Sequence, residues 1–571
     1  MIELVAATHR FDLPAANSVL AQEETARVLL VDPNMHGRAL AHGIAEPLLY
    51  DRVRANTAHR ASQQAAAATV MLNRAMGRVL RDLIPEAQGA AWCSLRIRHM
   101  LWTSLAYRQV WKEVLPQYQV KRWHVLLPAQ AHAYGIHSFL PGLALMDALQ
   151  EAAQPFAAYT FECPGAGPFQ LPDLTQLPDG LELLCHLPTC MHDAAYFASE
   201  IHASGLRAAV LSSQVYEVEL AGLPATGLVD ADQVLSLLPT GAIQALENLQ
   251  PALLAVLREH LSPHIAQPQY LELQVQALWQ ALRNQALLFF WLEQTLGSRP
   301  PKQFLLSTHD ATVHGAFQSF ASRHRVSLTL LPHSKVCNVP LPLDGAISRV
   351  LHEGLQDGPC LDLAGQTVPS QRLSYPGEWA PIPVHASKQS QGLRTLGVIL
   401  NGFSANGICL VDFDQYVNGL AQLRDWALGC GVRLRWRVRV AETPLTLLAA
   451  RLDLDEALLL EGAQGTILDF AGGCDLCVGY DNPTSGLHEL LRAGIPVLQA
   501  ECRPLSRAEW SIVNAQVAPR YNMPQLLDEL TLLHLNPGEF QAMPQRQHLA
   551  FLNSQSGAAP LSHWLRLGAL S

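Results

Sequence analysis

The stretch from Asp475 to Ala500 constrains what this chain can fold into more than any other part of the sequence. A short apolar run ends at Gly479, and an amphipathic segment then runs from Gly486 to Gly494. A second apolar run, Ile495 to Leu498, follows directly. Strand, turn, helix and strand over so short a distance predict a βαβ unit.

The turn of this unit carries residues suited to binding an anion. Thr484, Ser485 and Gly486 stand where the helix begins and leaves its first backbone amides unpaired. Such a helix start attracts phosphate. Glu489 lies one helical turn inside, close enough to accept hydrogen bonds from sugar hydroxyls attached to that phosphate. We therefore predict a nucleotide-binding turn, with Asn482 just ahead of it.

Length and charge limit the class of protein. The chain has 571 residues, more than one hydrophobic core usually supports, so we expect two large domains. Its formal net charge is -10, whereas nucleic-acid binders usually need a basic surface, so we expect no nucleic-acid partner. We see no signal-peptide pattern and no apolar stretch of about 18 residues. A cytoplasmic protein is expected; peripheral membrane association and the oligomeric state stay open.

The eleven cysteines indicate reduced, mostly buried thiols, because they are odd in number and scattered through a long chain. One cluster could be drawn as a metal site, although its spacings match no common zinc pattern. It consists of Cys185, His186, Cys190 and His192. Cys474 and Cys477 form a single CxxC, for which core packing is the better interpretation. We therefore expect no metal site.

Polar residues also follow two predicted strands of the first half, Gln303–Leu306 and Ser327–Leu331. Carboxyl ends of neighbouring parallel strands meet at one edge of a sheet, where ligands bind in open α/β folds. The polar residues are His309 and Asp310 after the first strand, and His333 and Ser334 after the second. Asp310 is either a helix N-cap or a catalytic residue. The pair after the second strand is either a ligand contact or a plain turn.

Apolar patterns predict strands and helices on both sides of a break in composition. Residues 340–391 are rich in Pro, Gly, Ser and Asp, which favours an irregular connector. It would join an N-terminal α/β domain over 1–339 to a C-terminal α/β domain over 392–545, with a closing helix over 546–571. Further predicted strands are Arg27–Asp32, Trp123–Pro128, Phe156–Cys163, Leu181–Cys185, Arg207–Ser212, Leu396–Leu400, Val432–Val440 and Ala457–Leu460. Predicted helices are Arg54–Leu83, Leu95–Val114, Phe139–Ala152, Asp193–Ala203, Thr240–Leu296 with breaks near 263 and 268, Ala311–Arg323, Phe413–Leu428 and Gly465–Phe470.

Two strands of the second half carry further candidates for an anion site. The strand over 396–400 is followed by Asn401 and Gly402, and a glycine lets backbone approach a ligand closely. The next strand has arginines at alternate positions, hence on one face. The row is either a solvated edge strand, or Arg437 and Arg439 near its carboxyl end reach a phosphate group.

The segment Ser485–Val497, SGLHELLRAGIPV, resembles the donor-binding turn of the GT-B glycosyltransferase superfamily. Members commonly show a small-residue helix start, then Glu, four residues and Gly-x-Pro-Val. STHDATVHGAF followed by LTLLPHS is similar to the last βαβ unit of the first domain in such enzymes and in nonhydrolysing nucleotide-sugar epimerases. The resemblance implies an α/β fold of two Rossmann-like domains facing across a cleft, with extra helices in the N-terminal domain.

The resemblance also implies a function. It is that of a metal-independent glycosyltransferase without a cofactor, which moves a sugar from a nucleotide sugar to a glycan, lipid-linked or protein acceptor in bacterial surface-glycan assembly. Asp310 is the first choice as base for the acceptor hydroxyl and His309 the second. The donor would contact Thr484, Ser485, Gly486, Glu489, Asn482, Arg437, Arg439, Asn401, Gly402, His333 and Ser334. Two alternatives stay open: a nucleotide-sugar 2-epimerase and a catalytically silent GT-B-like binding protein.

Overall fold

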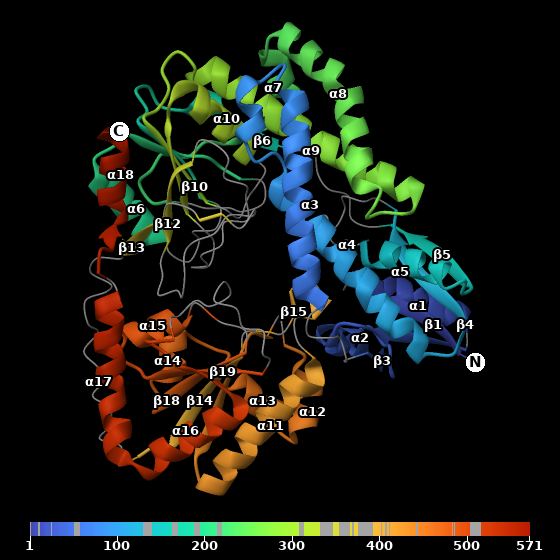
Figure 1. The fold of residues 1–571 in the computed structure, drawn as a ribbon, viewed down its shortest axis with the longest axis vertical. Helices are drawn as coiled ribbons and strands as arrows, with labels where there is room; N and C mark the ends of the chain where they lie inside the picture. Colours follow the sequence, from blue (N-terminus) through green and yellow to red (C-terminus); the bar gives the residue numbers. More distant parts are fainter. Residues whose placement is uncertain are drawn as a thin grey trace.

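The computed structural model arranges the described part of the chain around three parallel β-sheets flanked by helices (Figure 1). It describes residues 2–570 except 9–11, 24, 51–56, 130–139, 163–169, 188–193, 214–219, 308–312, 332–346, 353–365, 368–369, 375–391, 401, 403, 406–407, 410–411, 441–442, 482–483, 485, 503–514 and 555. The predicted α/β class is confirmed. The range predicted as one N-terminal domain, 1–339, holds the first sheet and four strands of the second, because strands and helices alternate in the same way whether they build one sheet or two.

The first sheet has the strand order β3-β2-β1-β4-β5 and all its pairs are parallel. Its strands are β1 (Ile2–Ala7), β2 (Ala26–Leu30), β3 (Leu48–Leu49), β4 (Val120–Pro128) and β5 (Phe156–Phe161). Its helices are α1 (Asp12–Gln22), α2 (His36–Ala41), α3 (Thr57–Leu80), α4 (Ser94–Val114) and α5 (Leu140–Glu151). The strands and helices predicted for this region from the sequence are confirmed, whereas β1, β3, α1 and α2 were not predicted.

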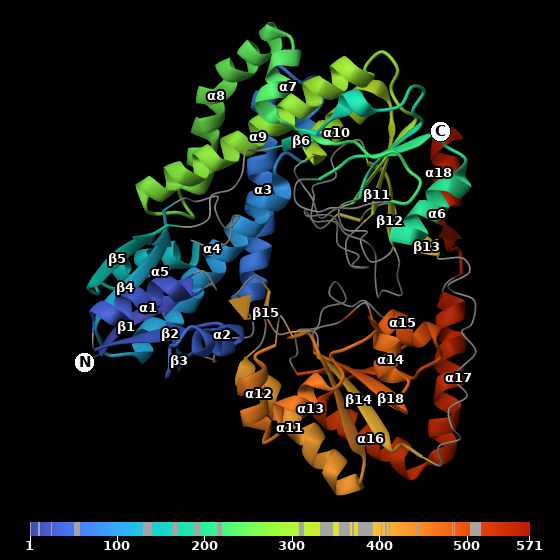
Figure 2. The same ribbon diagram turned by 180° about the vertical axis from the view of Figure 1, so that it is seen from behind.

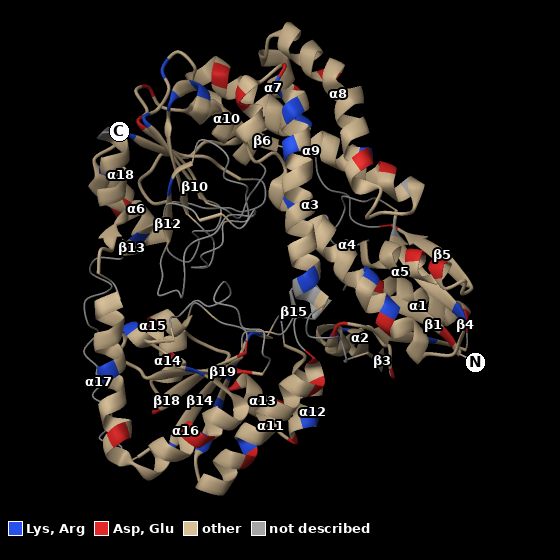
Figure 3. Ribbon diagram, viewed as in Figure 1, with Lys and Arg blue, Asp and Glu red and all other residues tan. Residues whose placement is uncertain are grey.

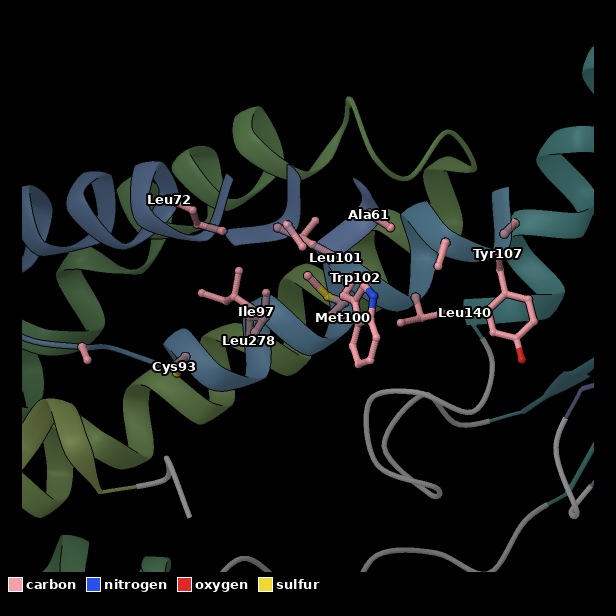
Figure 4. Close-up of a cluster of buried hydrophobic side chains, with 14 of the residues drawn as sticks. Ala61, Leu72, Cys93, Ile97, Met100, Leu101, Trp102, Tyr107, Leu140 and Leu278 are labelled. Atoms are coloured by element: carbon pink, nitrogen blue, oxygen red, sulfur yellow. The ribbon is translucent and has the colours of Figure 1, made fainter. Parts of the chain in front are cut away.

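Long helices join the first sheet to the second. α8 (Thr240–Leu261) and α9 (Pro268–Leu296) form a helical hairpin, and the predicted break near 263 and 268 lies between them. α3 packs along α4 and α8, and α4 along α5. Figure 4 shows their shared core, in which Ile97 of α4 lies between Leu72 of α3 and Leu278 of α9, with Met100 and Trp102 of α4 beside them. This apolar contact fixes the position of the first sheet relative to the second.

The second sheet has the order β21-β13-β12-β11-β10-β7-β8. Its strands are β7 (Leu183–His186), β8 (Ala208–Val210), β10 (Gln303–Ser307), β11 (Ser327–Leu331), β12 (Ile347–His352), β13 (Ser370–Ser374) and β21 (Ala559–Pro560). Its helices include α6 (Ala194–Ser204), α7 (Ala231–Leu237) and α10 (His314–His324), and β6 (Gln170–Pro172) pairs with β9 (Leu228–Asp230) beside it. β12 and β13 lie in the range predicted as an irregular connector. Only Val350, Leu351 and Leu373 are fully buried in them, too few to produce a strand pattern in the sequence.

The third sheet has the order β17-β14-β18-β19-β20. Its strands are β14 (Thr395–Leu400), β17 (Arg433–Val438), β18 (Leu476–Tyr480), β19 (Val497–Glu501) and β20 (Arg520–Asn522), with the short pair β15 (Ser404–Ala405) and β16 (Ile408–Cys409) beside it. Its helices are α11 (Phe413–Cys430), α12 (Leu445–Leu452), α13 (Glu456–Leu460), α14 (Ile467–Ala471), α15 (Gly486–Arg492), α16 (Met523–Leu535) and α17 (Pro537–Ser554). The βαβ unit predicted from Asp475 to Ala500 is confirmed as β18, α15 and β19.

One prediction in the third sheet is wrong: residues 457–460 are not a strand but part of α13. The Asp455 side chain accepts a hydrogen bond of 2.9 Å from the backbone N–H of Ala457 and so caps the first turn. A run of four apolar residues has no periodicity of its own, and this cap decides in favour of the helix.

The C-terminal part of the chain returns from the third sheet to the second. α17 packs against α15 and α16, whereas α18 (Leu561–Leu570) packs against α6 (Figure 2). The expected closing segment is therefore two helices, separated by the short strand β21. The backbone N–H of Ser562 donates to Glu200 (2.9 Å), and Gln303 donates to the carbonyl of Leu565 (2.8 Å), which fastens α18 to the second sheet.

Charged residues of both signs are interspersed over the lobes of the structure (Figure 3). None of the described helices is both long and apolar enough to cross a membrane.

Candidate functional site

The order of strands in the third sheet reverses direction between β14 and β18. From β14 the chain passes to β17 on one side and then to β18 on the other. A crevice for ligands forms at such a switch point, outside the carboxyl ends of the two strands. Leu400 and Tyr480 pair at these ends. Gly402 follows β14 as a buried residue with a φ of +76°, which glycine adopts without strain.

The predicted donor turn follows β18 at this switch point. The Thr484 hydroxyl accepts a hydrogen bond from the backbone N–H of Gly486 (3.3 Å), and the Thr484 carbonyl accepts one from Leu487 (3.2 Å). A Cβ on Gly486 would lie 2.3 Å from Cδ1 of Ile467, so a side chain there would displace the end of the Ile467 side chain in α14. Asn482, Ser485 and Asn401 lie outside the described residues.

Glu489 lies in the first turn of α15, half-buried, and its carboxylate acts electrostatically on Arg437. Burial lowers the pKa of Arg437, while Glu489 and Asp469 oppose that shift. Nη1 of Arg437 donates to the carbonyl of Gly462 (2.9 Å), and Nη2 donates to that of Gly465 (3.2 Å). The guanidinium therefore anchors the loop before α14, the helix that packs against α15.

The other arginines of the row contact the same helices. Arg433 pairs with Glu461 (3.4 Å), and the guanidinium of Arg435 donates to the Phe470 carbonyl (2.9 Å). Arg439 lies beyond the end of β17 and is exposed. β17 is the edge strand of its sheet; Arg435 and Arg437 bind carbonyls of α14 and of the loop before it, whereas Arg433 makes only an exposed pair.

The second sheet has its own switch point, between β7 and β10. From β7 the chain passes to β8 on one side and to β10 on the other. His186 ends β7 and Ser307 ends β10, both buried, and His186 pairs with Leu306. The Ser307 hydroxyl has no hydrogen-bond partner in the structure as described. Nε2 of His314 donates to the Ser307 carbonyl (2.9 Å), which ties the start of α10 to the end of β10.

The predicted catalytic residues follow β10 directly. His309 and Asp310 lie outside the described residues, as do His333 and Ser334 after β11. β10, the described strand that precedes His309 and Asp310 in the sequence, borders the switch point of the second sheet. The sequence alone did not indicate that Ser307 and His186 end neighbouring strands, because strand order is a property of the folded sheet.

The described part of the chain contains no group of three or more His, Cys, Asp or Glu side chains placed to hold a metal ion. Cys185 and His186 are successive residues of β7, so their side chains point to opposite faces of the sheet. Cys185 belongs to an apolar core with Leu183 and Leu305. Cys190 and His192 lie outside the described residues.

Comparisons with solved structures find several glycosyltransferases. The glycosyltransferase SnogD from Streptomyces nogalater is similar at 13% identity, covering 68% of this chain and 99% of that chain, with a TM-score of 0.34. The spinosyn rhamnosyltransferase SpnG, also solved with thymidine diphosphate and with spinosyn aglycone, is similar at 13% identity over the same shares, with a TM-score of 0.29. No protein-family model and no curated protein matches the sequence.

Proposed function

We propose that this protein is a glycosyltransferase that moves a sugar from a nucleotide-sugar donor to an acceptor hydroxyl. The observation that carries the proposal is the β14–β18 switch point. A close turn with Thr484 and Gly486, followed by Glu489 in the first helical turn, stands at the edge of the sheet where ligands bind. Backbone amides at the start of α15 suit a phosphate, and the carboxylate suits the hydroxyls of the attached ribose.

We propose that the residues after β10 contact the acceptor. We propose that the Asp310 carboxylate, or failing it the His309 imidazole, takes the proton of the acceptor hydroxyl. The acceptor oxygen then bonds to the anomeric carbon of the donor sugar while the nucleotide leaves with the electrons of the broken bond. Amides and positive side chains near the leaving phosphate stabilise its developing charge. On this basis we propose a reaction without a metal ion or a cofactor.

The acceptor is proposed to be a glycan, a lipid-linked molecule or a protein, in bacterial surface-glycan assembly. The protein would act in the cytoplasm, with peripheral association to a membrane where the acceptor is lipid-linked. Nucleic acid is not a proposed partner, since the net charge of -10 provides no basic surface for it.

Replacing Asp310 by Ala tests the assignment of the base. Sugar transfer from a donor found by a nucleotide screen should fall to background, while the affinity for the nucleotide stays within about twofold of the unchanged protein, since the base does not bind the donor. Unchanged turnover would overturn the role of Asp310. Incubation with donor alone separates the alternatives: conversion of the donor sugar without an acceptor indicates a 2-epimerase, and failure of every nucleotide to bind favours a silent binding protein.

A further inference from the structure

Cys474 and Cys477 share a small space beside the central strand of the third sheet. Cys477 lies in β18, opposite Gly397 of β14, and Cys474 precedes that strand. A Cβ on Gly397 would lie 2.8 Å from Sγ of Cys474 and 3.1 Å from Sγ of Cys477. The two sulfurs therefore occupy the position that a side chain at residue 397 would fill, and they are hydrogen-bonded to each other.

Arg435 lies against this pair of thiols. Its Nη1 donates to the Phe470 carbonyl (2.9 Å), and the thiol of Cys474 donates to the same oxygen (3.6 Å). The guanidinium also stacks over the Phe470 ring, with its carbon 5.3 Å from the ring centre. A cation held beside a thiol by two further contacts stabilises the thiolate, the form that reacts as a nucleophile.

The two cysteines differ in a way that suits consecutive steps of one reaction. The hydrogen bond from Cys477, and then Arg435, hold the pKa of Cys474 below its ordinary value, and Cys474 is partly exposed. Cys477 is fully buried, and its hydrogen bond to Cys474 raises its pKa well above the ordinary value, as does burial. Burial likewise raises the pKa of Cys93 to about 12.

We propose that Cys474 and Cys477 form a peroxide-reactive dithiol that closes to a reversible disulfide. The Cys474 thiolate attacks one oxygen of a hydroperoxide; an S–O bond forms, the O–O bond breaks, and the departing oxygen leaves with a proton. Cys474 becomes a sulfenic acid. The Cys477 sulfur then attacks the Cys474 sulfur; the S–S bond forms, the S–O bond breaks, and the hydroxyl group leaves as water with the Cys477 proton. The peroxide is reduced and both sulfurs are oxidised.

The sequence allows a direct measurement of this disulfide. Cleavage after Arg451 and Arg492 gives a peptide, 452–492, whose only cysteines are Cys474 and Cys477. After treatment of the intact protein with hydrogen peroxide, this peptide should be two hydrogens lighter and resist alkylation, and a dithiol reductant should restore both properties. Before oxidation, Cys474 should be alkylated faster than the half-buried Cys430, because a lowered pKa raises the fraction of Cys474 present as thiolate.

Three variants sharpen the test. Cys477→Ser removes the second sulfur, so the sulfenic acid at Cys474 should persist and react with dimedone. Arg435→Gln should slow the oxidation of Cys474, by up to about tenfold, and should leave the oxidation of Cys430 unchanged. Cys430→Ser serves as the matched control and should not change the 452–492 peptide. The proposal is overturned if both cysteines of this peptide stay alkylatable after peroxide, or if Cys474 reacts no faster than Cys430.

Discussion

At the scale of single residues, Arg437 has a role in the structure that its sequence pattern did not indicate. The alternating pattern shows that the arginines of β17 share a face, but it cannot show what lies opposite that face. The structure places the carbonyls of Gly462 and Gly465 there, and both accept hydrogen bonds from Arg437. The role that follows for Arg437 is to position the loop next to Glu489.

Replacing Arg437 by Lys tests this positioning role. A lysine cannot reach both carbonyls with a planar fork, so the free energy of unfolding should fall by about 1–3 kcal/mol. The nucleotide affinity should fall with it, because the loop beside Glu489 loses its anchor. Thermal unfolding and calorimetric titration measure the two effects. Arg433→Lys, which alters the exposed pair with Glu461, is the control and should change neither. A loss of affinity without any loss of stability would instead indicate direct contact with the phosphate.

Gly486 offers a second test at this scale, because its place is set by Ile467. Gly486→Ala should lower the free energy of unfolding by about 1–3 kcal/mol through overpacking. Adding Ile467→Ala removes the clashing atoms, so the double variant should lose less than the sum of the two single changes. Denaturant titration of the unchanged protein, the two single variants and the double variant measures the four free energies of unfolding. Simple additivity would show that the contact does not explain the glycine.

Glu3 should make stability depend on pH. Its carboxylate is bonded to His124 Nε2 (2.7 Å) and to Lys121 Nζ (3.2 Å), and these bonds lower its pKa. A lowered pKa in the folded protein stabilises the fold above the ordinary value of about 4, and the stabilisation disappears as pH falls through the folded value. Glu3→Gln should therefore melt at a lower temperature than the unchanged protein at neutral pH, and the difference should close in acid. A constant difference across the range would contradict this.

At the scale of elements, the sequence predicted most long helices and buried strands, and short elements account for the differences. α3, α4, α9, β10 and β11 have enough apolar residues to reveal their period. The apolar run at 457–460 is too short and too uniform to show a period, and the Asp455 cap decides in favour of a helix there. β12 and β13 were not predicted because few of their residues are buried, so their sequences show no apolar strand pattern.

We expect α18 to stabilise the second sheet and to leave the nucleotide site of the third sheet unaffected. The Arg349 guanidinium donates to the carbonyl of Trp564 (2.7 Å), and the Trp564 indole donates to that of Arg372 (3.1 Å). Trp564→Ala should lower the free energy of unfolding by about 2–4 kcal/mol through lost packing and lost hydrogen bonds. The exposed neighbour His563 provides the control, and His563→Ala should cost less than about 0.5 kcal/mol. Nucleotide affinity should stay the same in both variants. A large loss of affinity in either variant would contradict the claim that α18 does not affect the third sheet.

At the scale of the whole molecule, the sequence indicated the class of fold but not the arrangement of its sheets. Which strands become neighbours is decided by how helices cover each sheet, and no local pattern records that choice. The same limit applies to the candidate site. The residues of the turn from Thr484 to Glu489 were identified from their local pattern, whereas the switch points beside β18 and β10 emerge only from the strand orders.

Nucleotide binding at the β14–β18 switch point is the central claim, and calorimetric titration with a panel of nucleoside diphosphates tests it most directly. At least one nucleotide should bind, and Glu489→Gln should weaken it about tenfold, or about 1.4 kcal/mol, because a neutral amide accepts hydroxyl hydrogen bonds less strongly. Glu539→Gln, which alters an exposed pair with Arg546, should leave the affinity unchanged. Absence of binding by every nucleotide, or equal affinity in the Glu489 variant, would contradict the claim.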